Sequence, residues 1–460
     1  MMNGRLRTMQ TGIRLRVAAI VAVLTLLSSA CVPTTPGTQG GASSTGSAAG
    51  EASTTEKIVL QLWHHWSTSR HPLLQAVVKD FMEANPDIEV VETLQPQDGI
   101  VEKLLTAIAG GSAPDVAMLH RRNLLAFAAE GALMPLDSYI EEAGIQEDYW
   151  YPGELASNRY DGNVYGLPLT EGLTFLNYNT AMWEAAGLDP DAFPATWDEF
   201  FDAVSKLTVM DANGQVQRAG YSLGDNLGRA FLLWLVANGQ SSIYSEDVRT
   251  ARVNTPAAVE TIAFLKRLTD DALGGYQNMQ TFTAAASGLD QPPFVLEQSA
   301  VEVGQAWQFL IIQETNPNLQ YRLAPFPGGP SGDGPVAVNQ AGWSYVIPVG
   351  TKHPDAAWRL LKYLTVDEGA KKFLLSQGRA SPVVQYNESG DYDNLPHWSE
   401  FLQVSSRSRP VQVSPVHPQV ETVLQEMMER VLIGQMTPEE GAEWGNAEVQ
   451  RLLDEFWAAH

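Results

Sequence analysis

Cysteine is almost missing from this sequence of 460 residues, because Cys31 is the only one. A single cysteine cannot form a disulfide within the chain, which excludes the small secreted folds that depend on several such bridges. Long apolar runs are missing too. The run at Val17–Ala30 is shorter than the roughly 20 apolar residues that a membrane-spanning helix needs, and no second run follows it.

Basic residues are also scarce: the chain has 29 Lys and Arg against 53 Asp and Glu, a formal net charge of −24 at pH 7. An acidic chain of this kind repels nucleic acid and anionic lipid, so binding to either is not expected. The sequence contains no Ser/His/Asp motif, no phosphate-binding P-loop and no HExxH motif. We therefore expect neither catalysis nor a cofactor.

A metal site is not predicted either. His64 and His65 are adjacent in a segment that reads as a strand and its end, where neighbouring side chains point to opposite faces. No third ligand lies near them in the sequence, and a metal ion held by protein needs at least three.

The N-terminus has the three parts of a secretion signal. Four arginines and no acidic residue occupy the first sixteen positions, the apolar run Val17–Ala30 follows, and small residues precede Cys31. The stretch Leu27–Cys31 resembles a bacterial lipoprotein signal, in which the cysteine is lipidated and becomes the first residue. Residues 1–30 are thus predicted to be a signal peptide, and Cys31 to carry the acyl chains that anchor the protein to the outer side of the cell membrane.

Residues 31–56 are rich in Gly, Ser, Thr and Ala and poor in large apolar side chains. Such a segment cannot bury enough surface to offset its ordering entropy, so a flexible linker is expected. About four hundred residues follow, more than a single hydrophobic core usually holds, and two lobes are the default expectation.

Strands and helices alternate after the linker. Ile58–Trp63, Ile88–Glu92 and Pro114–Leu119 read as short buried strands, and the segments between them carry apolar residues at helical spacing. Alternation of this kind produces parallel strands joined by right-handed crossovers. The expected fold class is α/β, and an open sheet of this class binds ligands beyond the carboxyl ends of its strands.

The order of several segments resembles the maltose-binding-like class of bacterial extracellular solute-binding proteins (family 1), the lipoprotein components of ABC-type sugar importers. The segments run from Lys57 to the C-terminus and include IVLQLWHHW, APDVAML, YDGNVYGLPLTEGLTFLNYN, PATWDEFFDAVSKL, VEVGQAWQFL and NQAGWSYVIPVG. The resemblance implies a two-lobed clamp in which each lobe is a mostly parallel sheet flanked by helices. Residues 57–171 and 325–378 would form the N-lobe, and residues 172–324 and 379–460 the C-lobe. Crossings would lie near 171–174, 321–325 and 378–382.

The same resemblance implies a monomer that captures a sugar or oligosaccharide between its lobes and delivers it to the permease subunits of an ABC transporter. Two alternatives remain. The ligand could be a glycerol-phosphate ester or another non-sugar solute, which would call for Arg121, Arg122 or Arg379 on a phosphate. A lipid-anchored secreted hydrolase is the alternative from a different class.

Candidate ligand contacts follow from the strand ends, from the crossings and from aromatic residues that can stack on sugar rings. Trp307 follows a glycine where the family places an aromatic in the cleft, and Glu171 lies at the first crossing. The expected contacts are His65, Trp66, His120, Arg121, Glu171, Trp307, Trp343 and Arg379.

Overall fold

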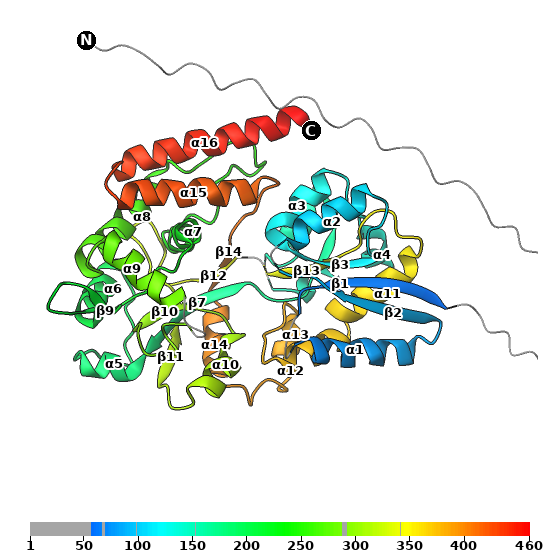
Figure 1. Cartoon of the computed structure of the whole chain (residues 1–460), viewed down its shortest axis with the longest axis horizontal. Coiled ribbons are helices and arrows are strands. Elements are labelled where there is room, and N and C mark those ends of the chain that lie inside the picture. The colour runs from blue at the N-terminus through cyan, green and yellow to red at the C-terminus, as the bar shows by residue number, and fades with distance from the viewer. Residues whose placement is uncertain (1–56, 67–69, 98, 152, 288–291, 341) are drawn as a thin grey trace, which may run out of the picture. The chain divides into compact units, whose positions relative to one another are not determined.

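A computed structural model describes residues 57–66, 70–97, 99–151, 153–287, 292–340 and 342–460. The predicted signal peptide, Cys31 and the linker lie outside these residues. Two five-stranded sheets divide the described chain into a first lobe and a second lobe, each built on one sheet (Figure 1). The predicted two-lobed α/β fold is confirmed.

The first sheet is built largely as the sequence predicts. Its strand order is β2-β1-β3-β13-β6, and β1 is parallel to both β2 and β3. The returning strand β13 is antiparallel to β3 and to β6. The strands are β1 (Ile58–His64), β2 (Ile88–Leu94), β3 (Val116–His120), β6 (Gly166–Pro168) and β13 (Trp343–Val346).

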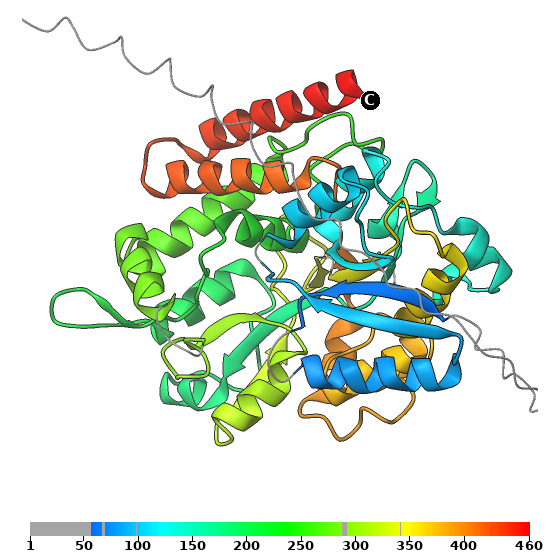
Figure 2. The ribbon, with the colours of Figure 1, turned by 45° about the vertical axis from the view of Figure 1, so that its right-hand side comes forward.

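Alternate residues of β1 are buried on opposite faces, which sets the two layers of helices over this sheet. Leu60 and Leu62 pack with α1, α11 and α12, whereas Trp63 packs with α2 and α3. Figures 1 and 2 show α1 along one side of β1 and β2. The helices of this lobe are α1 (His71–Ala84), α2 (Ile100–Ala109), α3 (Arg121–Ala129), α4 (Asp137–Glu142), α11 (Pro354–Thr365) and α12 (Glu368–Ser376). Short 3₁₀ turns at Glu147–Tyr149 and Ala156–Asn158 and the hairpin β4 (Arg159–Tyr160) to β5 (Asn163–Val164) complete it.

The second sheet departs from the expected parallel arrangement. Its order is β10-β7-β12-β14, with β11 also paired to β7, and β7 is antiparallel to β10, β11 and β12. The expectation of a mostly parallel sheet is wrong for these strands, because β7 carries the chain away from the first lobe and its partners bring the chain back. The strands are β7 (Leu173–Asn179), β10 (Val301–Gly304), β11 (Tyr321–Ala324), β12 (Ala337–Asn339) and β14 (Ser408–Pro410).

Helices cover the second sheet, and the last two, α15 and α16, pack on α7 and α8 (Figure 1). A capping box at Thr196 and Glu199 begins α6. The elements are α5 (Thr180–Ala185), α6 (Trp197–Leu207), β8 (Val209–Met210), β9 (Val216–Arg218), α7 (Leu227–Ala237), α8 (Pro256–Arg267), a π-helix (Leu268–Ala272), α9 (Tyr276–Ser287), α10 (Gln308–Thr315), α13 (Val384–Asn387), α14 (Trp398–Ser405), α15 (His417–Leu432) and α16 (Pro438–Ala459).

The chain passes between the lobes in three places. The first passage joins β6 to β7, and the second joins β12 to β13. A second crossing near 321–325 was expected and is wrong, because β11 and β12 both pair with β7 inside the second sheet. Residues 325–339 therefore belong to the second lobe. The third passage follows α12 and takes several residues. Within it, Ala380 packs into a second-lobe core, whereas Val383 packs into a first-lobe core.

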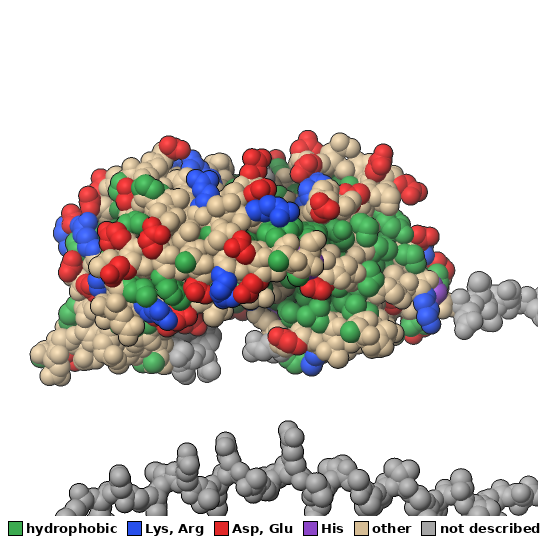
Figure 3. Space-filling model, turned by 90° about the horizontal axis from the view of Figure 1, so that it is seen from above, with side chains coloured by type: hydrophobic (Ala, Val, Ile, Leu, Met, Phe, Trp, Pro, Cys, Tyr) green, Lys and Arg blue, Asp and Glu red, His purple; other side chains and the backbone are tan. Residues whose placement is uncertain are grey.

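Charged side chains are spread over the surface seen from above, with acidic and basic groups interspersed (Figure 3). No helix among the described residues is long and apolar enough to cross a bilayer.

Trp234 of α7 is the centre of the second lobe's aromatic core. Its ring is fully buried and contacts the rings of Phe200, Tyr221, Phe264 and Phe326. Trp234→Ala is expected to lower the free energy of unfolding by about 3–5 kcal/mol, because it leaves a large cavity among these rings.

Denaturant unfolding followed by circular dichroism measures this loss. Ile433→Ala is the control, because that side chain is 51% exposed and its removal should change stability by no more than about 0.5 kcal/mol. Equal stability of the two variants would contradict the packing described for Trp234.

Candidate functional site

The predicted ligand contacts come from separate segments of the chain that the fold brings together between the lobes. His65 and Trp66 follow the carboxyl end of β1, and His120 is the last residue of β3. Trp343 begins β13, directly opposite His120 in the antiparallel register. The first sheet thus presents all four rings at the edge that faces the second lobe.

These rings contact one another. The ring of His65 lies 4.0 Å from that of Trp343 and 4.9 Å from that of Trp66, measured between centroids. His120 meets Trp343 edge to face at 4.9 Å. The ring of Phe373 in α12 packs edge to face against Trp66, with 5.3 Å between the ring centroids. Trp66 is almost fully buried, with 1% of its surface exposed, whereas His65, His120 and Trp343 are partly exposed, and the first sheet sets the positions of all four rings.

Trp307 brings the second lobe to the same place. It lies just before α10, after the strand β10, and its indole Nε1 donates to the side chain of Gln305 at 3.0 Å. The guanidinium carbon of Arg379 is 5.2 Å from the centroid of the Trp66 ring and 5.7 Å from that of Trp307. The guanidinium carbon of Arg70 is 5.8 Å and 5.9 Å from the same two centroids. Two cations thus lie between one tryptophan of each lobe.

Glu171 lies at the first passage between the lobes, with 8% of its surface exposed. Its Oε2 accepts a hydrogen bond from the backbone N–H of Leu173 at 2.7 Å. Burial and the nearby Glu154 raise the pKa of Glu171, and this is opposed by the Leu173 hydrogen bond and by the charges of Arg379 and Arg121. The raised pKa favours the protonated carboxyl, which can both donate and accept a hydrogen bond.

Burial also disfavours the charged forms of the other ionisable groups at the site. Burial and repulsion from Arg70 lower the pKa of Arg379. Burial, together with repulsion from Arg379 and Arg70, lowers the pKa of His65 to about 3, so its ring is neutral at pH 7. The site therefore offers neutral imidazoles and two desolvated guanidinium groups as partners for polar atoms.

Arg121 differs from the other seven predicted contacts. Its side chain is fully buried and forms an ion pair with Glu154, and one guanidinium nitrogen donates to the backbone oxygen of Thr170 at 3.1 Å. Glu154 in turn accepts from Asn339 at 2.8 Å and from the backbone of Gly172 at 3.3 Å. Arg121 thus holds the first two passages between the lobes, and the expectation that it reaches the ligand is corrected to this bracing position.

Sequence analysis missed several residues at the site. Arg70 lies just before α1 and was not considered, although it follows Trp66 closely in the chain. Glu302 of β10 is 7% exposed, and burial raises its pKa to about 8. Arg122, which the sequence indicated only as a possible phosphate contact, forms a 3.6 Å ion pair with Glu421 of α15, and this pair joins the two lobes. No sequence signal links Arg122 to Glu421, because they are some three hundred positions apart.

A cavity of about 860 Å³ also lies between the lobes, but it includes none of the eight predicted contacts. It is lined by residues such as Tyr160 and Asp161 of the first lobe and Arg249, Val413 and Trp457 of the second. Its residues carry no row of stacked rings shared by both lobes, so we place the candidate site at Trp66 and Trp307.

Comparison with known proteins gives one family. Residues 67–371 match the family described as bacterial extracellular solute-binding protein. A binding protein of Brucella abortus (strain 2308) is 24% identical over 379 residues, covering 81% of this chain and 88% of that relative. The multiple sugar-binding protein of Streptococcus mutans is 25% identical over 317 residues, covering 67% of this chain and 71% of that relative.

A solved structure has the same fold. It is an ABC transporter solute-binding protein from Thermotoga lettingae bound with α-D-tagatose, with a TM-score of 0.71 and 25% identity. The match covers 86% of this chain and all of the other.

The bracing position of Arg121 can be tested by comparison with its neighbour. Arg121→Met is expected to lower the free energy of unfolding by about 3–5 kcal/mol, because it leaves the Glu154 carboxylate buried without its cation. Arg122→Met is the matched control on the same helix. Its side chain is 41% exposed, and an exposed ion pair contributes at most about 1 kcal/mol. If thermal and denaturant unfolding show equal stability for the two variants, Arg121 is not a brace.

Proposed function

The chain belongs to the family of bacterial extracellular solute-binding proteins, and from this premise we propose that it captures a carbohydrate between Trp66 and Trp307. The observation that carries the proposal is the pair of tryptophans, one from each lobe, with Arg70 and Arg379 near both rings. Sugars present apolar C–H faces that stack on aromatic rings, and hydroxyl groups that need directional polar partners.

The polar groups around the tryptophans suit hydroxyl groups. Guanidinium groups and neutral imidazoles donate to hydroxyl oxygens, and the carboxyl of Glu171 accepts from hydroxyl hydrogens. Hydrogen bonds to charged groups contribute about 1.5–3 kcal/mol each when well formed. Since Glu171 lies at a passage between the lobes, a ligand bound there would contact both lobes and the hinge together.

Capture would be a hinge motion. Three passages join the lobes, and an ion pair between Arg122 of the first lobe and Glu421 of the second also links the lobes. A ligand favours the closed form only as far as it binds that form more tightly than the open one. Contacts to Trp66 in one lobe and Trp307 in the other provide that difference. The closed, loaded form would then be the one presented to the permease subunits of an ABC transporter.

A phosphate ester is the second candidate ligand, and one observation favours it. Arg70 and Arg379 repel each other, which contributes to the lowered pKa of Arg379. A phosphate group between them would relieve this repulsion through charge-assisted hydrogen bonds. Binding of the compound rather than its conversion is proposed in either case, with no catalytic residue assigned.

We expect Trp307→Ala to weaken carbohydrate binding by about 1–3 kcal/mol, or roughly 5- to 150-fold in Kd, because it removes a stacking face. A thermal-shift screen identifies the sugar, since a ligand of the folded state raises the Tm. Calorimetry then measures the affinity.

Trp457→Ala is the matched control. Trp457 also lies against an arginine, Arg249 at 4.1 Å, but it lines the separate cavity of about 860 Å³. If Trp457→Ala loses affinity and Trp307→Ala does not, the ligand binds in that cavity and the proposed site is wrong. If only phosphate esters raise the Tm, the carbohydrate proposal fails and the second candidate replaces it.

The proposed location is the outer side of the cell membrane, with lipidated Cys31 as the anchor. Cys31→Ser is expected to release a folded, ligand-competent protein into the soluble fraction, because the predicted linker separates the anchor from both lobes. Membrane fractionation with immunodetection measures the release, and Ser44→Ala in the linker is the control. Full retention of the Cys31→Ser protein in the membrane fraction would rule out this anchor.

A further inference from the structure

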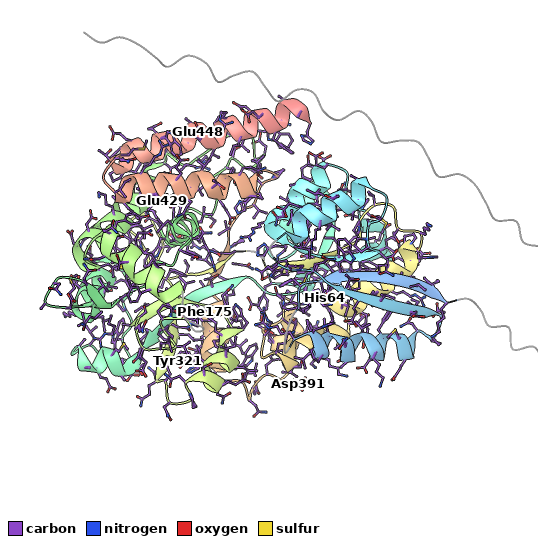
Figure 4. All side chains as sticks on the ribbon, in the orientation of Figure 1. His64, Phe175, Tyr321, Asp391, Glu429 and Glu448 are labelled. Atoms are coloured by element: carbon purple, nitrogen blue, oxygen red, sulfur yellow. The ribbon has the colours of Figure 1, made fainter. Side chains whose placement is uncertain are left out.

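His64, the residue before the ligand-site pair His65 and Trp66, belongs to a different cluster. Side chains of β1 alternate between the faces of the sheet, so His64 points to the face covered by α1, together with Leu60 and Leu62. Figure 4 labels His64 at the end of β1 near the middle of the molecule. Its side chain is fully buried.

Two potential metal ligands meet His64 on this face. Glu92 of β2 is paired in register with Leu62 and so lies diagonally opposite His64 on the neighbouring parallel strand. His71 is the first residue of α1, which returns over this corner of the sheet. The Glu92 Oε2 atom is 3.4 Å from His71 Nε2 and 3.8 Å from His64 Nε2. All three ligand atoms lie within 4.8 Å of one another.

The potential ligand atoms of these three side chains are buried. Within the described chain, His64 Nε2, His71 Nε2 and Glu92 Oε2 are each closed off from solvent and lack a hydrogen bond of good geometry, although Glu92 Oε2 lies within ion-pair distance of both histidines. Buried polar atoms are nearly always well hydrogen-bonded, so three that have only one another as partners call for a reason. The side chains differ in exposure, with 0% for His64, 12% for Glu92 and 30% for His71. The partly exposed His71 leaves a path from solvent to the cluster.

We propose that His64, His71 and Glu92 form a binding site for a divalent transition-metal ion such as Zn²⁺. Two histidines and one carboxylate are a known zinc ligand set, and a fourth position remains for water. Ligands about 2.0–2.1 Å from a tetrahedral ion lie roughly 3.4 Å apart. The His71–Glu92 distance already has this value, whereas His64 Nε2 is 3.8 Å from Glu92 Oε2 and its ring centroid is 5.0 Å from that of His71, so His64 must move toward the other two when the ion binds.

One contact must change when the ion binds. The backbone N–H of Trp66 donates to Nδ1 of His64 at 3.2 Å, which places the proton of the neutral ring on Nε2. Binding through Nε2 moves that proton to Nδ1 and removes this hydrogen bond. A single long, neutral hydrogen bond is a small loss beside three metal–ligand bonds. The site is therefore separate from the ligand cluster at Trp66 but adjoins it through one backbone group.

The sequence predicts no metal site, because the histidine adjacent to His64 is His65, which points to the other face. Glu92 lies on the next strand, and His71 lies on the next helix. Neither is marked by a short ligand motif, since Glu92 follows His64 by more than twenty positions. The pairing register of β1 and β2 is what brings them together.

The test is titration of the metal alone. Untagged mature protein, stripped of metal with a chelator, is titrated with ZnCl₂ by calorimetry at neutral pH. One ion per chain is expected, and Co²⁺ should give the strong visible absorption of a four-coordinate ion. Loss of an outer-shell partner usually costs about 10–100-fold in affinity, so loss of a ligand in His71→Gln or Glu92→Gln should cost about 100-fold or more.

Glu89→Gln and His353→Gln are the matched controls, because Glu89 lies on the same strand and both side chains are exposed. Far-UV circular dichroism checks that each variant is folded. A rise in Tm with Zn²⁺ in the unaltered protein, absent in whichever ligand variant folds, supports the site. The proposal is overturned if no saturable binding occurs, or if the ligand variants bind Zn²⁺ as tightly as the controls. Neither outcome depends on whether the protein binds a carbohydrate.

Discussion

The buried ion pair between Arg121 and Glu154 holds the first two of the three passages between the lobes in place. Glu154 accepts from Asn339, the last residue of β12, and from the backbone of Gly172, just before β7. Arg121 begins α3 and donates to Thr170. One carboxylate and one guanidinium group thus connect the end of the first sheet, the start of the second and the return strand. A buried pair of this kind contributes to specific geometry more than to net stability.

The site depends on this bracing. The first sheet sets the row formed by His65, Trp66, His120 and Trp343, because their strands pair directly. Trp307 belongs to the other lobe, and it can share Arg70 and Arg379 with Trp66 only if the passages hold the lobes in the correct relative orientation. Arg379 comes from the third passage and lies near both tryptophans. Affinity for a solute and the geometry of the hinge are therefore set by the same few residues.

The fold could be predicted from sequence wherever local pattern decides it. The strands of the first lobe follow from short apolar runs, and the helices between them follow from apolar residues at helical spacing. The second crossing could not be predicted, because β11 and β12 are short strands whose lobe is decided by their pairing with β7. The same applies to the antiparallel run of β7, which has no local signal.

The candidate site shows a similar division. Strand ends and crossings indicated seven residues that the fold brings together, since those positions have a fixed relation to the sheets. Burial could not be predicted: Arg121 and Arg122 are neighbours, yet one is fully buried and the other faces the second lobe. Arg70, Glu302, His71 and Glu92 become visible only through contacts between distant segments.

Closure of the lobes on a carbohydrate is the central claim, and X-ray scattering of the protein with and without a saturating sugar tests it most directly. A hinge that closes on a ligand shared by Trp66 and Trp307 makes the molecule more compact. The account predicts a smaller radius of gyration with the sugar, and a higher sugar concentration to reach the same decrease in Trp307→Ala. Superimposable curves for the unaltered protein with and without bound sugar would contradict it.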